Sequence, residues 1–71
     1  MADSVYAVTE LVGTSTESWE QAAANAVETA SQSLRDLRIA EVLQLDMDLE
    51  NGQVLAYRAR VKLSFKYERP A

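Results

Sequence analysis

The sequence predicts an α+β fold in which one amphipathic helix is partly wrapped by a three-stranded antiparallel sheet, in the order βαββ. Three observations predict this fold. A segment rich in β-branched residues comes first, apolar residues then recur every three or four positions, and two long segments with period-two alternation follow. We interpret residues 1–71 as a single domain, because nothing in the chain resembles a linker, a repeat or a low-complexity segment.

The first strand is expected over residues 4–12, with Gly13-Thr14-Ser15 as the break that ends it. A helix is expected over residues 16–36, because the hydroxyl groups around Thr16 can accept its free N–H groups and nearby glutamates suit its positive end. No proline interrupts it. The stripe expected to face the sheet comprises Trp19, Ala23, Ala26 or Val27, Ala30, Leu34 and Leu37.

A β-hairpin is expected from two strands, at residues 39–50 and 53–67, joined by Asn51-Gly52, the strongest short hairpin signal. Strict alternation would place one set of residues on one face of the first of these strands: Ile39, Glu41, Leu43, Leu45, Met47 and Leu49. Its other face carries Asp46, Asp48 and Glu50. We expect these acids to lie against Arg58, Arg60 and Lys62 of the next strand, and Pro70-Ala71 to form a short tail.

The small size of the chain favours an oligomer. A domain of this length buries only about 60% of its unfolded surface, and the sequence contains no Cys for a disulfide and no His. One helix covers one face of the sheet at most, so the remaining faces and edges of two such long strands need other cover. Further copies of the same chain are the natural cover.

The amino-acid composition also excludes several classes of function. Without Cys or His, thiol chemistry, Cys/His zinc sites and the commonest general base are absent. An acyl- or phosphoryl-transfer enzyme is therefore disfavoured, and we expect no enzyme activity. The net charge of −4 argues against nucleic-acid and membrane partners, and the lack of a signal-like or membrane-spanning segment favours a cytoplasmic protein.

Several short motifs together resemble the dodecin family. They are Val12-Gly13-Thr14-Ser15 after the first strand, Ser33-Leu34-Arg35 at the helix end, Glu41-Val42, Asn51-Gly52 and Lys62-Leu63-Ser64-Phe65. The resemblance runs from about Tyr6 to Tyr67. It implies a hollow homododecamer of cubic symmetry with ligand pockets and ion sites between subunits, and hence a non-enzymatic shell for storage or buffering.

The flavin pocket of the family is substituted in this chain. Flavin-binding dodecins stack the ring on a Trp and hydrogen-bond it with a Gln, and the corresponding positions hold Ile39 and Arg58. Isoleucine offers no π-stacking and arginine has no acceptor. Binding of FMN, FAD or riboflavin is therefore the alternative function, and not the first expectation.

The segment Ser18–Ala24 with Gln44–Met47 and Tyr57-Arg58 is more similar to the calcium-binding dodecin subgroup. Calcium prefers six to eight oxygen ligands, which symmetry-related carboxylates can supply. The metal candidates by chemistry are Glu17, Asp46, Asp48 and Glu50. A solvated face paired with the basic residues of the neighbouring strand is the simpler interpretation of the last three.

Two further features have a structural and a functional interpretation. Trp19 can be a ligand platform, but a packing residue is the more common role for an aromatic at a stripe position. A phosphate-bearing ligand such as coenzyme A can be bound by arginines, although ion pairing is again the simpler interpretation. The arginines concerned are Arg35, Arg38, Arg58 and Arg60.

Overall fold

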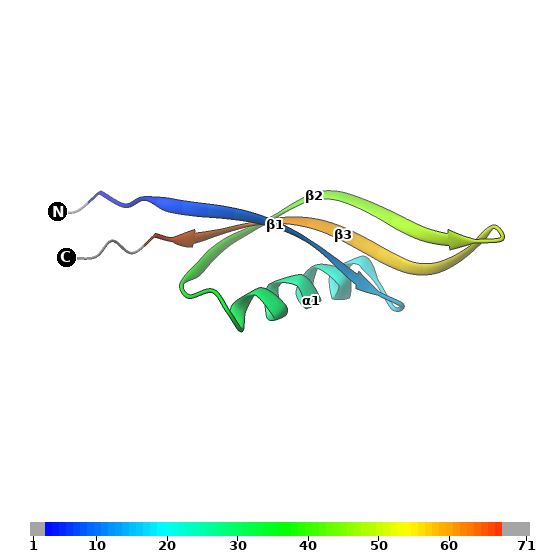
Figure 1. Cartoon of the computed structure of the whole chain (residues 1–71). Helices are drawn as coiled ribbons and strands as arrows, with labels where there is room; N and C mark the ends of the chain where they lie inside the picture. The colour runs from blue at the N-terminus through cyan, green and yellow to red at the C-terminus, as the bar shows by residue number, and fades with distance from the viewer. Residues whose placement is uncertain (1–2, 68–71) are drawn as a thin grey trace.

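The computed structural model describes residues 3–67 and contains one helix and one sheet. In chain order the elements are β1 (Tyr6–Ser15), α1 (Trp19–Ser31), β2 (Leu37–Glu50) and β3 (Gln53–Lys66). The strand order is β1-β3-β2 and both pairings are antiparallel, so β3 is the central strand, while α1 lies against one face of the sheet (Figure 1). The predicted βαββ fold and the β2–β3 hairpin are confirmed. No helix within residues 3–67 has the length and apolar character needed to cross a membrane.

Gly13 does not end the first strand, which the prediction placed at residues 4–12. The strand continues to Ser15, and Gly13 pairs with Ala59 inside the β1–β3 ladder, two pairs before the ladder ends. A Cβ at this position would lie 2.0 Å from the Ala22 carbonyl oxygen and 3.0 Å from Ala26 Cβ. Glycine is therefore needed here for the close approach of the helix, and not for a turn.

The helix is shorter than the predicted 16–36 at both ends. Ser15 Oγ accepts the N–H groups of Glu17 (2.9 Å) and Ser18 (3.4 Å), so the chain turns before the helix begins. Ser18 is the N-cap, and its side chain accepts the N–H of Gln21 at 3.0 Å. The helix ends at Ser31, and Asp36 has a φ of 59°, a left-handed conformation that a helix cannot contain.

A seam of small residues joins the helix to the sheet. The buried residues of α1 are alanines spaced four apart, and they meet Ala59, Val61 and Leu63 of β3. These alanines are Ala22, Ala26 and Ala30. Of the predicted stripe, Ala26 and Ala30 are buried, and Trp19 is half-buried. The other predicted stripe residues pack against the core as partly buried residues: Ala23, Val27, Leu34 and Leu37.

Three bulges break the alternation of the hairpin. Val42 pairs with Val61 but Gln44 pairs with Arg60, so Leu43 is an extra residue; similar shifts occur at Leu37/Ile39 and at Asp48/Leu49. The prediction of strict alternation along the whole of β2 is therefore wrong. Ile39 shares the face of Ser64, whereas Leu45 and Met47 share the face of Ala59 and Tyr57, which α1 covers. We call the face opposite α1 the open face.

The hairpin extends beyond the rest of the molecule. The last β1–β3 pair is Ser15–Tyr57, and Tyr57 pairs with Met47 on its other side, so residues 48–56, here named the arm, contain only β2, β3 and the turn between them. The turn at the tip has positive φ at Asn51 (51°) and Gly52 (75°), as a tight hairpin turn requires. Figure 1 shows the arm at one end of an elongated molecule, with the start of β1 and the end of β3 at the other. The principal extents are 55 × 20 × 15 Å.

Candidate functional site

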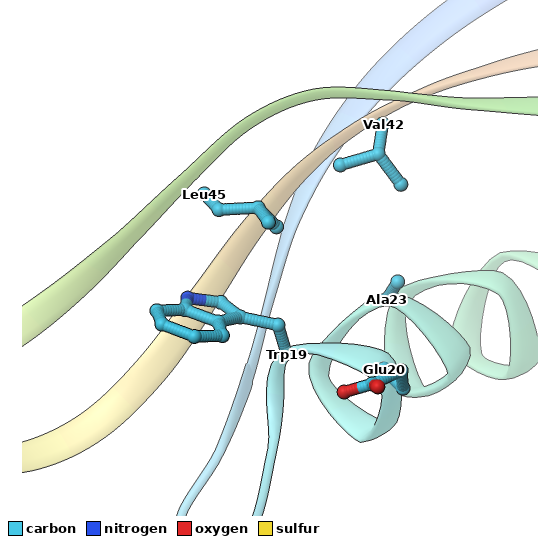
Figure 2. A pocket seen from close by; sticks show the side chains of 5 residues that line it. All are labelled: Trp19, Glu20, Ala23, Val42 and Leu45. Atoms are coloured by element: carbon cyan, nitrogen blue, oxygen red, sulfur yellow. The ribbon is translucent and has the colours of Figure 1, made fainter.

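An apolar cavity of about 450 Å³ lies between the first turns of α1 and the middle of β2. Its lining residues are Trp19, Glu20, Ala23, Val42 and Leu45. Figure 2 shows the Trp19 ring facing Leu45, with Val42 above Ala23. The Leu43 bulge makes this arrangement, because it places Val42 and Leu45 on the same face although they are three residues apart.

Trp19 connects the helix to the base of the arm. Its Nε1–H donates to the Asp46 carbonyl oxygen at 3.0 Å, and its ring meets Tyr57 edge-on with the centroids 4.9 Å apart. An edge-to-face pair at this distance is a favourable aromatic contact. Trp19 therefore has the packing role that the sequence favoured, and its ring also forms one wall of the cavity.

Asp46 and Arg58 form a two-pronged ion pair on the open face. Arg58 Nε donates to Asp46 Oδ1 at 2.8 Å, and Nη2 donates to Oδ2 at 3.4 Å. The hydrogen bond that Arg58 donates to Asp46, together with the negative charge of that carboxylate, raises the pKa of Arg58 above its ordinary value. The Asp46 carboxylate therefore already has a cationic partner.

The other expected acid–base pairs do not form as predicted. Asp48 is opposite Ala56 and Glu50 is opposite Gln53, so neither acid faces a basic residue of β3. Arg60 pairs instead with Glu10 of β1 (3.7 Å), and Lys62 pairs with Glu41 of β2 (3.5 Å). The error came from the register, because the bulges and the central position of β3 bring different acids to the basic strand.

The four metal candidates do not form one site in a single chain. Asp46 and Asp48 share the open face, Glu50 adjoins the hairpin turn, and Glu17 is exposed in the connection before α1. Within residues 3–67, no three acidic side chains come close enough together to hold a metal ion.

The two positions of the family flavin pocket also lie apart. Ile39 is opposite Ser64, six residues along β3 from Arg58, a separation of about 20 Å at roughly 3.3 Å per residue. Both side chains are on the open face, and Ile39 is 62% exposed. A ligand that contacts both positions therefore needs them from two chains.

The four arginines considered for coenzyme A fall into two groups. Arg58 and Arg60 lie in the middle of β3, whereas Arg35 lies in the connection before β2 and Arg38 is the second residue of β2, near the end of β3. Arg58 and Arg60 each have a carboxylate partner, and Arg38 lies 3.9 Å from Asp36. They do not form one phosphate-binding cluster within the chain.

Sequence reasoning missed the cavity, although it singled out Trp19. Strict alternation places Val42 and Leu45 on opposite faces, and only the bulge brings them together. The available signal was the run Val42-Leu43, two adjacent apolar residues inside an alternating strand.

Comparisons with known proteins agree with this fold. The Dodecin family model matches residues 5–68. The chain is 47% identical to a calcium dodecin of Mycobacterium tuberculosis over 68 residues, which cover 96% of this chain and 94% of that protein.

Two solved structures are closely similar as well. The structure of a dodecin from Streptomyces coelicolor has a TM-score of 0.91 at 44% identity, covering 99% of this chain and 100% of the other. A calcium-chelating immunodominant antigen from M. tuberculosis, described as a calcium dodecin with a novel calcium-binding site, has a TM-score of 0.81 at 42% identity, covering 94% and 99%. This chain belongs to the dodecin family.

Proposed function

We propose that this protein is a non-enzymatic subunit of a hollow dodecamer that binds calcium between its subunits, for storage or buffering. The observation that carries the assembly is the amount of apolar surface that one chain leaves exposed. Within residues 3–67, six hydrophobic residues are buried and thirteen large ones are exposed. Exposed apolar surface on this scale is typical of a protein that is completed by partners.

The charge distribution supports ion binding between chains. Calcium takes six to eight oxygen ligands, and no three acidic side chains of the described part of the chain converge. A calcium site therefore needs carboxylates from symmetry-related copies. Asp48, Glu50 and Glu17 are the first candidates, because Asp46 is already bound by Arg58. Calcium binding by the similar M. tuberculosis protein supports this choice of ion.

Calorimetric titration of the assembled protein with calcium tests the proposal. We expect saturable binding that weakens by about tenfold or more when Asp48→Asn and Glu50→Gln are combined, because each carboxylate lost removes a charged ligand. Glu28→Gln is the matched control, since Glu28 is an exposed acid of α1 and is not a candidate ligand. Absence of calcium binding by the intact assembly would reject calcium as the ligand.

Flavin binding is the second candidate function, because Ile39 and Arg58 share the open face and are exposed or half-buried there. Arg58 would have to exchange Asp46 for the flavin. We expect weak quenching of riboflavin fluorescence by the wild type and stronger quenching by Ile39→Trp, which restores a stacking ring. If Ile39→Trp does not change the affinity, the missing ring is not what limits flavin binding.

A further inference from the structure

The chain contains two asparagines, and the structure places them in different environments. Asn25 lies in α1, where its Nδ2–H donates to the Thr14 carbonyl oxygen at 2.9 Å and its Oδ1 accepts from Gln21 Nε2 at 2.8 Å. The side chain of Asn51 has no hydrogen-bond partner within residues 3–67. In the described part of the chain, hydrogen bonds therefore restrain the amide of Asn25 and not that of Asn51.

Asn51 and Gly52 form the exposed turn at the tip of the arm, where the hairpin extends past the other elements (Figure 1). A Cβ added to Gly52 would have no neighbouring atom within 4 Å. The Gly52 N–H donates to no acceptor within residues 3–67. The backbone nitrogen that follows Asn51 is thus neither shielded by a side chain nor engaged in a hydrogen bond there.

This pair of groups permits an intramolecular reaction. The Gly52 nitrogen can attack Asn51 Cγ, so that an N–Cγ bond forms, the Cγ–Nδ2 bond breaks, and the proton of the nitrogen leaves with the side-chain amide as ammonia. The product is a five-membered succinimide ring. Water then opens the ring, either at Cγ to give aspartate or at the backbone carbonyl carbon to give isoaspartate. Glycine favours the attack because no side chain lies beside its nitrogen.

Ring closure requires the turn to leave its folded conformation, because a two-residue turn fixes the backbone between the reacting groups. The arm makes this opening easy. Only two ladder pairs separate the turn from the irregularity at Asp48/Leu49: Glu50–Gln53 and Leu49–Val54. Leu49 is 58% exposed, Val54 is 47% exposed, and no buried core residue belongs to the arm. Segments with so few buried contacts open at little cost in free energy, without unfolding of the whole subunit.

We infer that Asn51-Gly52 is a site of spontaneous modification, at which Asn51 converts to aspartate and isoaspartate. Asp-Gly suits the same hairpin turn as Asn-Gly, so the aspartate form keeps the arm and adds a negative charge beside Glu50. Isoaspartate adds a backbone atom to a two-residue turn, so it disrupts the pairing at the tip. Residues 48–56 contain acidic residues and no basic one, so both products make an acidic segment more acidic.

Mass spectrometry of tryptic peptides from the full-length protein, aged at neutral pH, tests the inference. Cleavage after Arg35, Arg38 and Arg58 places Asn25 in residues 1–35 and Asn51 in residues 39–58. Asn51 should lose its amide at least about tenfold faster than Asn25, a difference of about 1.4 kcal/mol in activation free energy. A sample taken before ageing corrects for reaction during digestion. Equal rates at the two asparagines in the native protein would overturn the inference.

Isoaspartate identifies the route of the reaction. It forms through the ring, whereas direct hydrolysis of the side-chain amide gives aspartate alone. Edman degradation, which stops at isoaspartate, should therefore stop at position 51 in part of the 39–58 peptide from aged protein. A product that is aspartate alone would contradict attack by the Gly52 nitrogen.

Asn51→Gln is the matched variant, because glutamine has to close a larger ring that forms more slowly. The wild type should develop a more acidic species in anion-exchange chromatography, and the N51Q protein should not. The aspartate form of the wild type should elute with N51D, and N25Q should acidify as the wild type does. Acidification of N51Q at the wild-type rate would place the reaction elsewhere in the chain.

The modification does not depend on the proposed function. A chain that binds no calcium, or that is a monomer at micromolar concentration, would reject the calcium shell and leave the reaction of Asn51 unaffected. An assembly that binds calcium and keeps Asn51 unchanged on ageing would reject the modification alone.

Discussion

The helix-covered middle of the sheet and the arm use apolar residues in opposite ways. In the middle, small and large residues alike are buried: Ala22, Ala59 and Val61 are completely buried, and Gly13 lies directly beneath the helix. In the arm, much larger side chains such as Leu49 remain about half exposed. The difference teaches that the presence of a second layer, and not side-chain size, decides burial in this chain.

Substitutions in the helix-covered middle and in the arm should therefore affect the stability of the subunit differently. A change in the middle should lower the stability of every subunit, whereas a change in the arm should leave the subunit fold nearly intact. The following changes test that division and are arranged from the largest expected effect to the smallest. Stabilities are to be compared at one protein concentration, because association stabilises the folded chain.

Gly13→Ala should have the largest effect. The new Cβ would lie 2.0 Å from a backbone carbonyl oxygen of α1, so the helix must move away from the sheet. We expect a loss of about 3 kcal/mol in the free energy of unfolding, at the upper end of overpacking effects. Urea denaturation monitored by circular dichroism measures it. A loss below about 1 kcal/mol would show that the seam can widen easily.

Trp19→Ala should cost less, about 2 kcal/mol, because the ring is only half-buried although it contacts Tyr57 and bonds to Asp46. Trp19→Phe retains a ring and removes the N–H donor, so about 1 kcal/mol should be lost. Equal losses for both variants, measured by thermal unfolding, would mean that the hydrogen bond carries the whole effect.

Gly52→Ala is the arm counterpart of Gly13→Ala. Nothing lies within 4 Å of the added Cβ, but φ is +75°, so the cost is backbone strain of about 1 kcal/mol. Urea denaturation of the two glycine variants side by side gives a direct ratio of the middle to the arm. A larger loss in the free energy of unfolding for Gly52→Ala than for Gly13→Ala would show that the arm, and not the middle of the sheet, is the more sensitive region.

Asp46→Asn should have the smallest effect on stability, because the ion pair with Arg58 is substantially exposed and solvent screens it. Since the pKa of Arg58 is raised, the pair's contribution is complete below the ordinary arginine pKa and is lost only as pH rises through the higher folded value. The difference between wild type and variant should therefore stay constant from about pH 7 to about pH 9. A change across that range in urea titrations would contradict this assignment.

The sequence predicted the order of elements well because the signals are local. The Asn51-Gly52 turn, the helical spacing of alanines and the β-branched first segment each favour one structure without help from distant residues. The calcium and flavin assignments are still proposals, because they depend on contacts between chains that a single sequence does not encode locally.

The sequence-based predictions were wrong where contacts between distant residues determine the local structure. Gly13 was interpreted as a strand end, but its role is to admit the helix, which depends on Ala22 and Ala26. The expected charge ladder failed because three bulges shifted the register, so that only Asp46 meets the predicted kind of partner. Strict alternation has no means of anticipating an extra residue such as Leu43.

The bulges of β2 have a further consequence for the newly made chain. β2 is an edge strand in the described sheet, and it carries exposed Val42, Leu43 and Leu45, a surface that invites unwanted pairing with other strands. The irregularities at Leu37/Ile39 and Val42/Gln44 interrupt its row of hydrogen-bonding groups and increase its twist. Before it associates with other subunits, a newly synthesised chain therefore exposes an apolar edge strand. The interrupted hydrogen-bonding row makes this edge a poor template for the addition of further strands, as in amyloid.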